Sequence, residues 1–147
     1  MDFPLLNFAK IYNFKCKKNA NQYLIYDIIR KKFYVLTPEE WVRQHIIHYL
    51  VFDKKIPKIN FLVEKVVEIN GMKKRMDLLI YKDKKPFLLV ECKSPKTIIN
   101  QETFDQIMRY NSIVDASILM ITNGLNHIYA RLDKEEKKYK FITDFNF

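Results

Sequence analysis

Two carboxylates and a lysine in the middle of the chain have the types and the spacing of a hydrolytic site. Residues 76–81 and 87–92 are apolar runs that flank a lysine-rich, turn-like segment at residues 82–86. If the runs pair as an antiparallel hairpin about that segment, Asp77 lies directly opposite Glu91, and opposed Cβ atoms are roughly 4.5–5.5 Å apart. The spacing therefore predicts two neighbouring acidic side chains.

Lys93 lies two residues beyond Glu91 and therefore shares a face of the hairpin with both carboxylates. Two carboxylates beside an apolar core repel each other and resist ionisation unless a cation joins them. Oxygen ligands of this kind suit Mg²⁺ or Mn²⁺, which activate water, and a lysine can hold or polarise that water. The arrangement predicts hydrolysis of a phosphodiester bond. In a simpler interpretation these residues form only structural ion pairs, Glu91 with Lys93 and Asp77 with Arg75, and a register shift of one residue would remove the geometry.

A central, covered β-sheet must position these residues. Apolar side chains occupy both faces of the predicted hairpin, as in a strand pair buried on both sides. The sequence predicts a mixed α/β fold with a central mixed sheet flanked by helices, in a single domain of residues 1–147 whose first 36 residues form a β-rich extension. The expected elements are strands at 11–16, 23–29 and 33–36, a helix from 37 to about 52, strands at 61–69, 76–81 and 87–92, a helix at 100–114, and strands at 117–122, 127–132 and 140–145.

Local signals mark the start of the first helix and one tight turn. Thr37 can cap the helix, Pro38 suits the first helical position, and Glu40 completes a capping box. Asn70 and Gly71 together predict a two-residue hairpin turn after the strand at 61–69.

Composition limits the possible functions. The 147 residues include 26 Lys and Arg against 17 Asp and Glu, and the resulting net charge of +9 favours a polyanionic partner such as DNA. Two glycines are too few for a phosphate-binding P-loop or a dinucleotide-binding turn. Two cysteines form no disulfide framework or zinc pattern, and no apolar stretch is long enough to cross a bilayer. We therefore expect a cytoplasmic protein without a membrane segment.

The motifs around the carboxylates resemble the core of the PD-(D/E)XK nuclease superfamily. RMD at residues 75–77 is followed by PFLLVECK at 86–93, with methionine where a proline usually precedes the aspartate. TPEEWVRQ at 37–44 and QIMRY at 106–110 are similar to motifs of small restriction-like proteins related to the N-terminal nuclease domain of type I restriction enzyme R subunits. The resemblance covers roughly residues 20–132 and implies a restriction-endonuclease-like fold.

The resemblance also implies roles for individual residues. Asp77 and Glu91 would bind Mg²⁺ or Mn²⁺, and Lys93 would assist the attacking water. Gln106 and Tyr110 are one helical turn apart, so they share a helix face and could reach the site or a phosphate, unless that face is merely solvated.

A further metal ligand is expected from the first helix, and basic residues are expected at the DNA. Glu40 is the candidate ligand, although its capping role also explains it, and Glu39 competes because it lies on the apolar face of the helix. Arg43 could touch DNA or stabilise the helix. The expected DNA-binding residues are Arg43, Lys73, Lys74 and Arg75.

The implied function is a divalent-metal-dependent DNA nuclease of the restriction-modification type, with a role in host defence. The sequence does not distinguish an endonuclease from an exonuclease. Two alternatives stay open: a non-catalytic DNA-binding or assembly module, and a nuclease subunit that is active only with a partner. The expected partners are DNA and either a second copy of the chain or a recruiting subunit.

Overall fold

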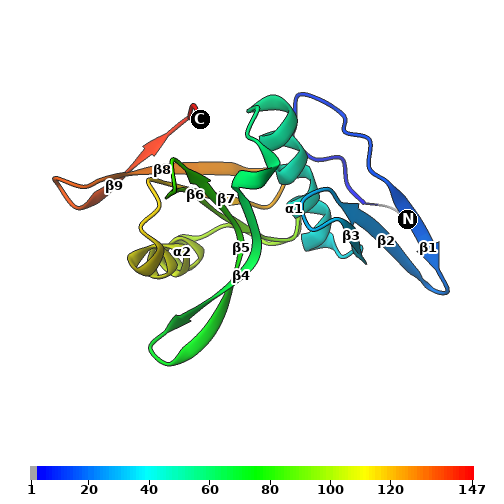
Figure 1. The fold of residues 1–147 in the computed structure, drawn as a ribbon, viewed down its shortest axis with the longest axis horizontal. Coiled ribbons are helices and arrows are strands. Elements are labelled where there is room, and N and C mark those ends of the chain that lie inside the picture. Colours follow the sequence, from blue (N-terminus) through cyan, green and yellow to red (C-terminus); the bar gives the residue numbers. More distant parts are fainter. Residues whose placement is uncertain (1–2) are drawn as a thin grey trace.

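A computed structural model describes residues 3–147 and contains two β-sheets and two α-helices (Figure 1). The small antiparallel sheet has the order β1-β2-β3, and the large sheet has the order β4-β5-β6-β7-β8-β9 with β6 and β7 parallel. The small sheet comprises β1 (Cys16–Asn19), β2 (Gln22–Asp27) and β3 (Lys32–Val35). The large sheet comprises β4 (Phe61–Ile69), β5 (Met72–Lys82), β6 (Lys85–Cys92), β7 (Ile118–Thr122), β8 (His127–Asp133) and β9 (Lys138–Ile142).

The two helices cover opposite faces of the large sheet. Helix α1 (Pro38–His48) packs on the face that includes Leu78 and Val90, and α2 (Gln101–Val114) packs on the face that includes Leu79 and Leu89. Figure 1 shows the small sheet beside α1, away from the large sheet. The predicted burial of both hairpin faces is confirmed, and the architecture is the expected mixed α/β fold with a central mixed sheet.

The register predicted for the β5–β6 hairpin is confirmed over its central part. Leu79 pairs with Leu89, and the flanking pairs follow the same register. Nearer the turn the prediction is wrong, because an irregularity after Ile80 pairs Tyr81 with Pro86. The turn itself consists of two residues with positive φ, Asp83 and Lys84, so the strands extend further toward it than predicted.

The start of α1 is as predicted, but the second half of its capping box is wrong. The Thr37 side chain accepts a hydrogen bond of 3.1 Å from the backbone N–H of Glu40. The N–H of Thr37 donates to the carbonyl of Val35, and the Glu40 carboxylate turns instead toward two arginines. The α-helix ends at His48, and a π-helical turn (Tyr49–Asp53) carries the chain through the region predicted as its last turn.

The strand limits predicted at the two ends of the chain are wrong. Tyr12 and Phe14 lie before β1 and pack their rings against His48 of α1, so they are aromatic without being strand residues. Strand β1 is exposed and polar, which hides it from an apolar pattern. Near the other end, Phe145 leaves the sheet after β9 and packs against Tyr129. In the described part of the chain, no helix is long and apolar enough to cross a membrane.

Candidate active site

Asp77 lies in the middle of β5 and Glu91 near the end of β6, each one residue beyond the last pair of the β5–β6 ladder. Both are buried, with 7% and 8% of their surfaces exposed. The backbone N–H of Cys92 donates to Oδ2 of Asp77 at 2.8 Å, which fixes this carboxylate beside β6. The Nζ of Lys93 lies 3.3 Å from Oε1 of Glu91. The structure therefore brings the three residues of the sequence motif together.

The charge of Glu91 is poorly compensated. Burial, together with the negative charge of Asp77, raises the pKa of Glu91 from its ordinary value of 4.5 to about 8, although Lys93 acts in the opposite direction. The surroundings of Glu91 therefore favour the protonated carboxyl. A second cation at this position would favour its ionised form.

The pair of carboxylates fits a hard divalent cation. Within residues 3–147, no three His, Cys, Asp or Glu side chains are placed to hold a metal together. Two carboxylates are nevertheless the protein ligands typical of Mg²⁺ sites, in which water and substrate phosphate complete the coordination. Asp77 and Glu91 are thus the residues that would hold the ion.

A buried network of ion pairs surrounds Asp77 on the α1 side. Nη2 of Arg43 lies 2.5 Å from Oδ1 of Asp77, and Nη1 of Arg43 contacts Glu40. Arg30, in the turn after β2, contacts Glu40 as well and lies 3.0 Å from Glu64 of β4. The side chain of Arg43 is 7% exposed and is held by carboxylates, so Arg43 has the stabilising role that the sequence left open beside DNA contact.

The two glutamates at the start of α1 are placed differently. Glu40 is buried between Arg30 and Arg43, so its carboxylate is already paired on both oxygens. The Glu39 side chain is 49% exposed, and its pKa is raised by partial burial and by the charge of Asp77. Glu39 has a longer ion pair with Arg43, of 3.7 Å, and is the more accessible of the two glutamates to an ion near Asp77.

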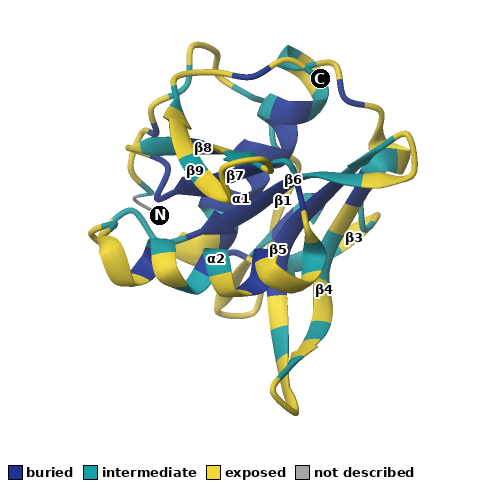
Figure 2. Cartoon of the chain, turned by 90° about the vertical axis from the view of Figure 1, so that its left-hand side faces the viewer, coloured by how far each residue is buried: buried dark blue, intermediate teal, exposed yellow. Residues whose placement is uncertain are grey.

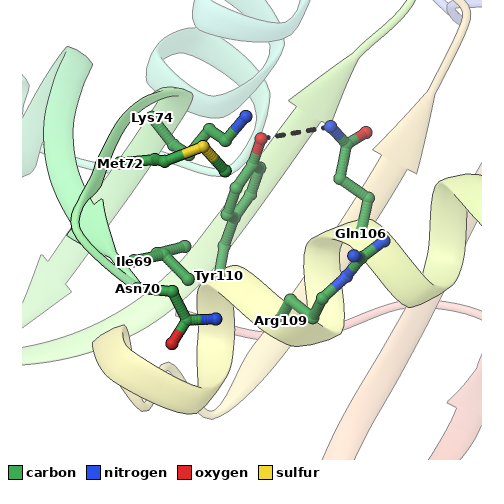
Figure 3. A pocket seen from close by; sticks show the side chains of 7 residues that line it. All are labelled: Ile69, Asn70, Met72, Lys74, Gln106, Arg109 and Tyr110. Carbon is green, nitrogen blue, oxygen red and sulfur yellow. Dashed lines mark hydrogen bonds between the residues drawn. The ribbon is translucent and has the colours of Figure 1, made fainter.

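Gln106 and Tyr110 of α2 lie on one helix face, as predicted, and contact each other (Figure 3). Nε2 of Gln106 donates to the Tyr110 hydroxyl at 3.1 Å. Burial and the nearby charge of Glu91 raise the pKa of Tyr110. This pair therefore borders the site from the α2 side of the sheet.

The remaining predicted basic residues lie on the β4–β5 hairpin. Lys73 and Arg75 are exposed, whereas Lys74 is half-buried and faces α2. Contact of these three residues with DNA stays a prediction.

Sequence reasoning missed Arg30, Asp27 and Glu64, which complete the buried network. Asp27 is fully buried and accepts hydrogen bonds from the backbone and Nε of Arg30. The register of β4 and β5 places Glu64 opposite Asp77, where the ladder is interrupted and Glu64 has a φ of 54°. The only signal in the sequence was Glu64, an acidic residue within an apolar strand pattern.

The stability of the protein is expected to depend on pH through Glu91. The unfolded chain releases the proton of Glu91 near pH 4.5 and the folded chain near pH 8, so the wild-type protein loses stability as pH rises through this range. Glu91→Gln removes that loss. We expect the variant to be more stable in metal-free buffer, by about 1–3 kcal/mol near neutral pH.

Urea unfolding of both proteins at pH 4, 6, 8 and 9 measures the difference. It should be smallest at pH 4 and constant above about pH 8. A stability difference that does not grow with pH would show that Glu91 ionises normally in the folded state.

Comparison with known proteins is consistent with the predicted relationship. The family model described as type I restriction enzyme R protein N terminus matches residues 38–145. One solved structure, a fragment described as an HsdR subunit of a type I restriction enzyme from Vibrio vulnificus YJ016, is 21% identical with a TM-score of 0.41. That match covers 58% of this chain and only 18% of the other, and no curated protein matches significantly. Because the family model spans most of the sequence, the chain belongs to the type I restriction enzyme R protein N-terminal family.

Proposed function

We propose that the protein is a Mg²⁺-dependent deoxyribonuclease that acts on DNA in the cytoplasm, as a homodimer or with a recruiting subunit, in host defence. The observation that carries this proposal is the placement of two buried carboxylates, Asp77 and Glu91, beside each other with the Nζ of Lys93 3.3 Å from Glu91. Family membership supports a restriction-related role, and the net charge of +9 supports a DNA partner.

Each residue of the site has a distinct task in this function. A bound divalent ion would supply charge neutralisation and Lewis-acid activation for phosphodiester hydrolysis. Asp77, fixed by Arg43 and by the Cys92 N–H, would hold that ion in a constant position together with Glu91. Lys93, whose side chain is 25% exposed, would orient the attacking water or a phosphate oxygen.

We also propose a supporting role for one helix residue on each side of the sheet. Glu39 replaces Glu40 as the candidate for a further contact to the metal ion, since the Glu40 carboxylate is paired with Arg30 and Arg43. Gln106 would donate the second N–H of its amide nitrogen, which Tyr110 does not use, to a DNA phosphate.

The proposal is tested by incubating the protein with supercoiled plasmid, linear duplex and single-stranded DNA, each with Mg²⁺, Mn²⁺ or EDTA. We expect cleavage with either metal and none with EDTA. Glu91→Gln is the matched inactive variant, because it removes one ligand while leaving the fold intact or more stable.

Calorimetric titration with Mn²⁺ gives a second measurement that does not depend on cleavage. We expect one site in the wild-type protein and at least a tenfold loss of affinity in Glu91→Gln, since loss of a ligand removes a charge-assisted contact. Equal Mn²⁺ affinity in the two proteins would exclude Glu91 from the ligand set.

One contact favours the alternative of a non-catalytic DNA-binding module. Arg43 already places a positive charge 2.5 Å from Asp77, where a metal ion would otherwise be needed to neutralise that carboxylate. A wild-type protein that binds DNA, fails to bind Mn²⁺ and leaves every DNA form intact would support this alternative. A protein that binds Mn²⁺ but cuts only with a partner would be the third possibility.

A further inference from the structure

A pocket of about 300 Å³ lies between the β4–β5 hairpin and α2 (Figure 3). The hairpin projects from the large sheet as an arm of exposed and half-buried residues, banded yellow and teal at the bottom of Figure 2. One wall of the pocket comes from the arm and the other from α2. The lining residues are Ile69, Asn70, Met72 and Lys74 of the arm, and Gln106, Arg109 and Tyr110 of the helix.

The register of the arm explains which side chains face the pocket. Ile69 pairs with Met72, and Lys74 lies two residues further along β5, so the three side chains share one face. Lys73 and Arg75 point to the other face of the arm. The arm therefore presents two apolar side chains and one lysine to α2.

The pocket combines an apolar wall with two cationic side chains. Met72 is 58% exposed although it is apolar, and Ile69 packs only partly against the core. Neither Lys74 nor Arg109 forms an ion pair with any residue in the described range 3–147. A ligand that complements this lining has an apolar body and an anionic group.

The pocket is adjacent to a second hollow that reaches Lys93. This hollow, of about 280 Å³, shares Gln106 and Arg109 with the pocket, and its other lining residues are Lys93, Thr97, Ile98, Asn100, Glu102 and Thr103. A chain of linked anionic units could therefore extend from the Lys93 site into the pocket past Arg109.

We propose that the pocket binds one unpaired nucleotide of a single DNA strand, with its base against Ile69 and Met72 and its phosphates between Lys74 and Arg109. The inference rests on the proposed function, since the strand that enters the pocket would be the strand presented to Lys93. A base in a duplex is covered by its neighbours and its partner and would have to be extruded first. The site therefore selects single-stranded DNA or a frayed end over intact duplex.

The test is a fluorescence-anisotropy titration in EDTA, so that binding is measured without cleavage. The probes are a labelled oligothymidylate, an abasic oligomer of the same length and a duplex. We expect Met72→Ala to weaken binding of the oligothymidylate about fivefold through lost apolar contact with a base, and to leave the abasic oligomer, which carries no bases, unchanged. Lys74→Gln should weaken both single strands and reduce the slope of log K against log salt by about 0.7.

Lys137→Gln is the matched control for charge, because Lys137 is exposed in the β8–β9 turn and outside both hollows. Equal effects of Lys74→Gln and Lys137→Gln, or equal effects of Met72→Ala on the oligothymidylate and the abasic oligomer, would overturn the pocket assignment. If the wild-type protein is inert with Mg²⁺ but the pocket variants behave as expected, the nuclease proposal fails and the binding site stands. If the wild-type protein cleaves DNA and both pocket variants bind DNA as the wild type does, the nuclease proposal stands and the binding site fails.

Discussion

Lys93→Ala is expected to reduce the rate of DNA cleavage about 10²–10⁴-fold, the usual effect of removing a group that positions or activates the nucleophile. The Nζ of Lys93 lies 3.3 Å from Glu91 and is partly exposed, so it can contact a water or a phosphate oxygen without binding the metal itself. Binding of Mn²⁺ and of DNA should be nearly unchanged. Single-turnover cleavage assays at saturating Mg²⁺, with calorimetry of Mn²⁺ binding, measure the two effects separately.

Lys96→Ala is the control for this experiment, because Lys96 is exposed and lies three residues further along the same segment. A purely structural ion pair between Lys93 and Glu91 predicts a different result, namely a loss of stability of ~0–1 kcal/mol with normal cleavage. A Lys93→Ala protein that cuts at the wild-type rate would therefore remove Lys93 from the catalytic residues, whatever its motif suggests.

The geometry around Lys93 could be predicted because it depends on local rules. Alternation of side chains along a strand and a lysine-rich turn set the pairing of Leu79 with Leu89, and that pairing places Asp77 near Glu91. The turn was placed less accurately, since a single irregularity after Ile80 changes the last pairs without changing the apolar pattern.

The surroundings of Asp77 could not be predicted from local rules. Arg30, Glu40 and Glu64 come from three different elements and meet only because α1 packs between the two sheets. In the sequence, Glu40 has a sufficient explanation as a helix cap, and an arginine in a basic chain suggests DNA contact. Burial makes Glu40 and Arg43 partners of each other, because a buried charge needs a partner of opposite charge.

Arg43 therefore gives the second large effect, on folding. Arg43→Met is expected to destabilise the protein by about 3–5 kcal/mol, because it leaves Glu40 and Asp77 buried without their common counter-charge. Arg131, which is exposed, provides the control, and Arg131→Met should change stability by less than about 0.5 kcal/mol. Urea unfolding in metal-free buffer measures both variants, and Arg43→Lys provides an intermediate case if Arg43→Met does not fold.

The same variants show whether the arginine and a metal ion share Asp77. If they do, Mg²⁺ should stabilise Arg43→Lys more than the wild-type protein. Lysine neutralises the carboxylate less well than the two-pronged guanidinium, and the bound ion would supply the missing positive charge. The added Asp77→Asn substitution should then cancel this extra stabilisation in a double-mutant cycle. An equal response to Mg²⁺ in all these proteins would show that Asp77 belongs to the buried network alone. Glu91 would then be the one remaining carboxylate proposed to bind the metal ion.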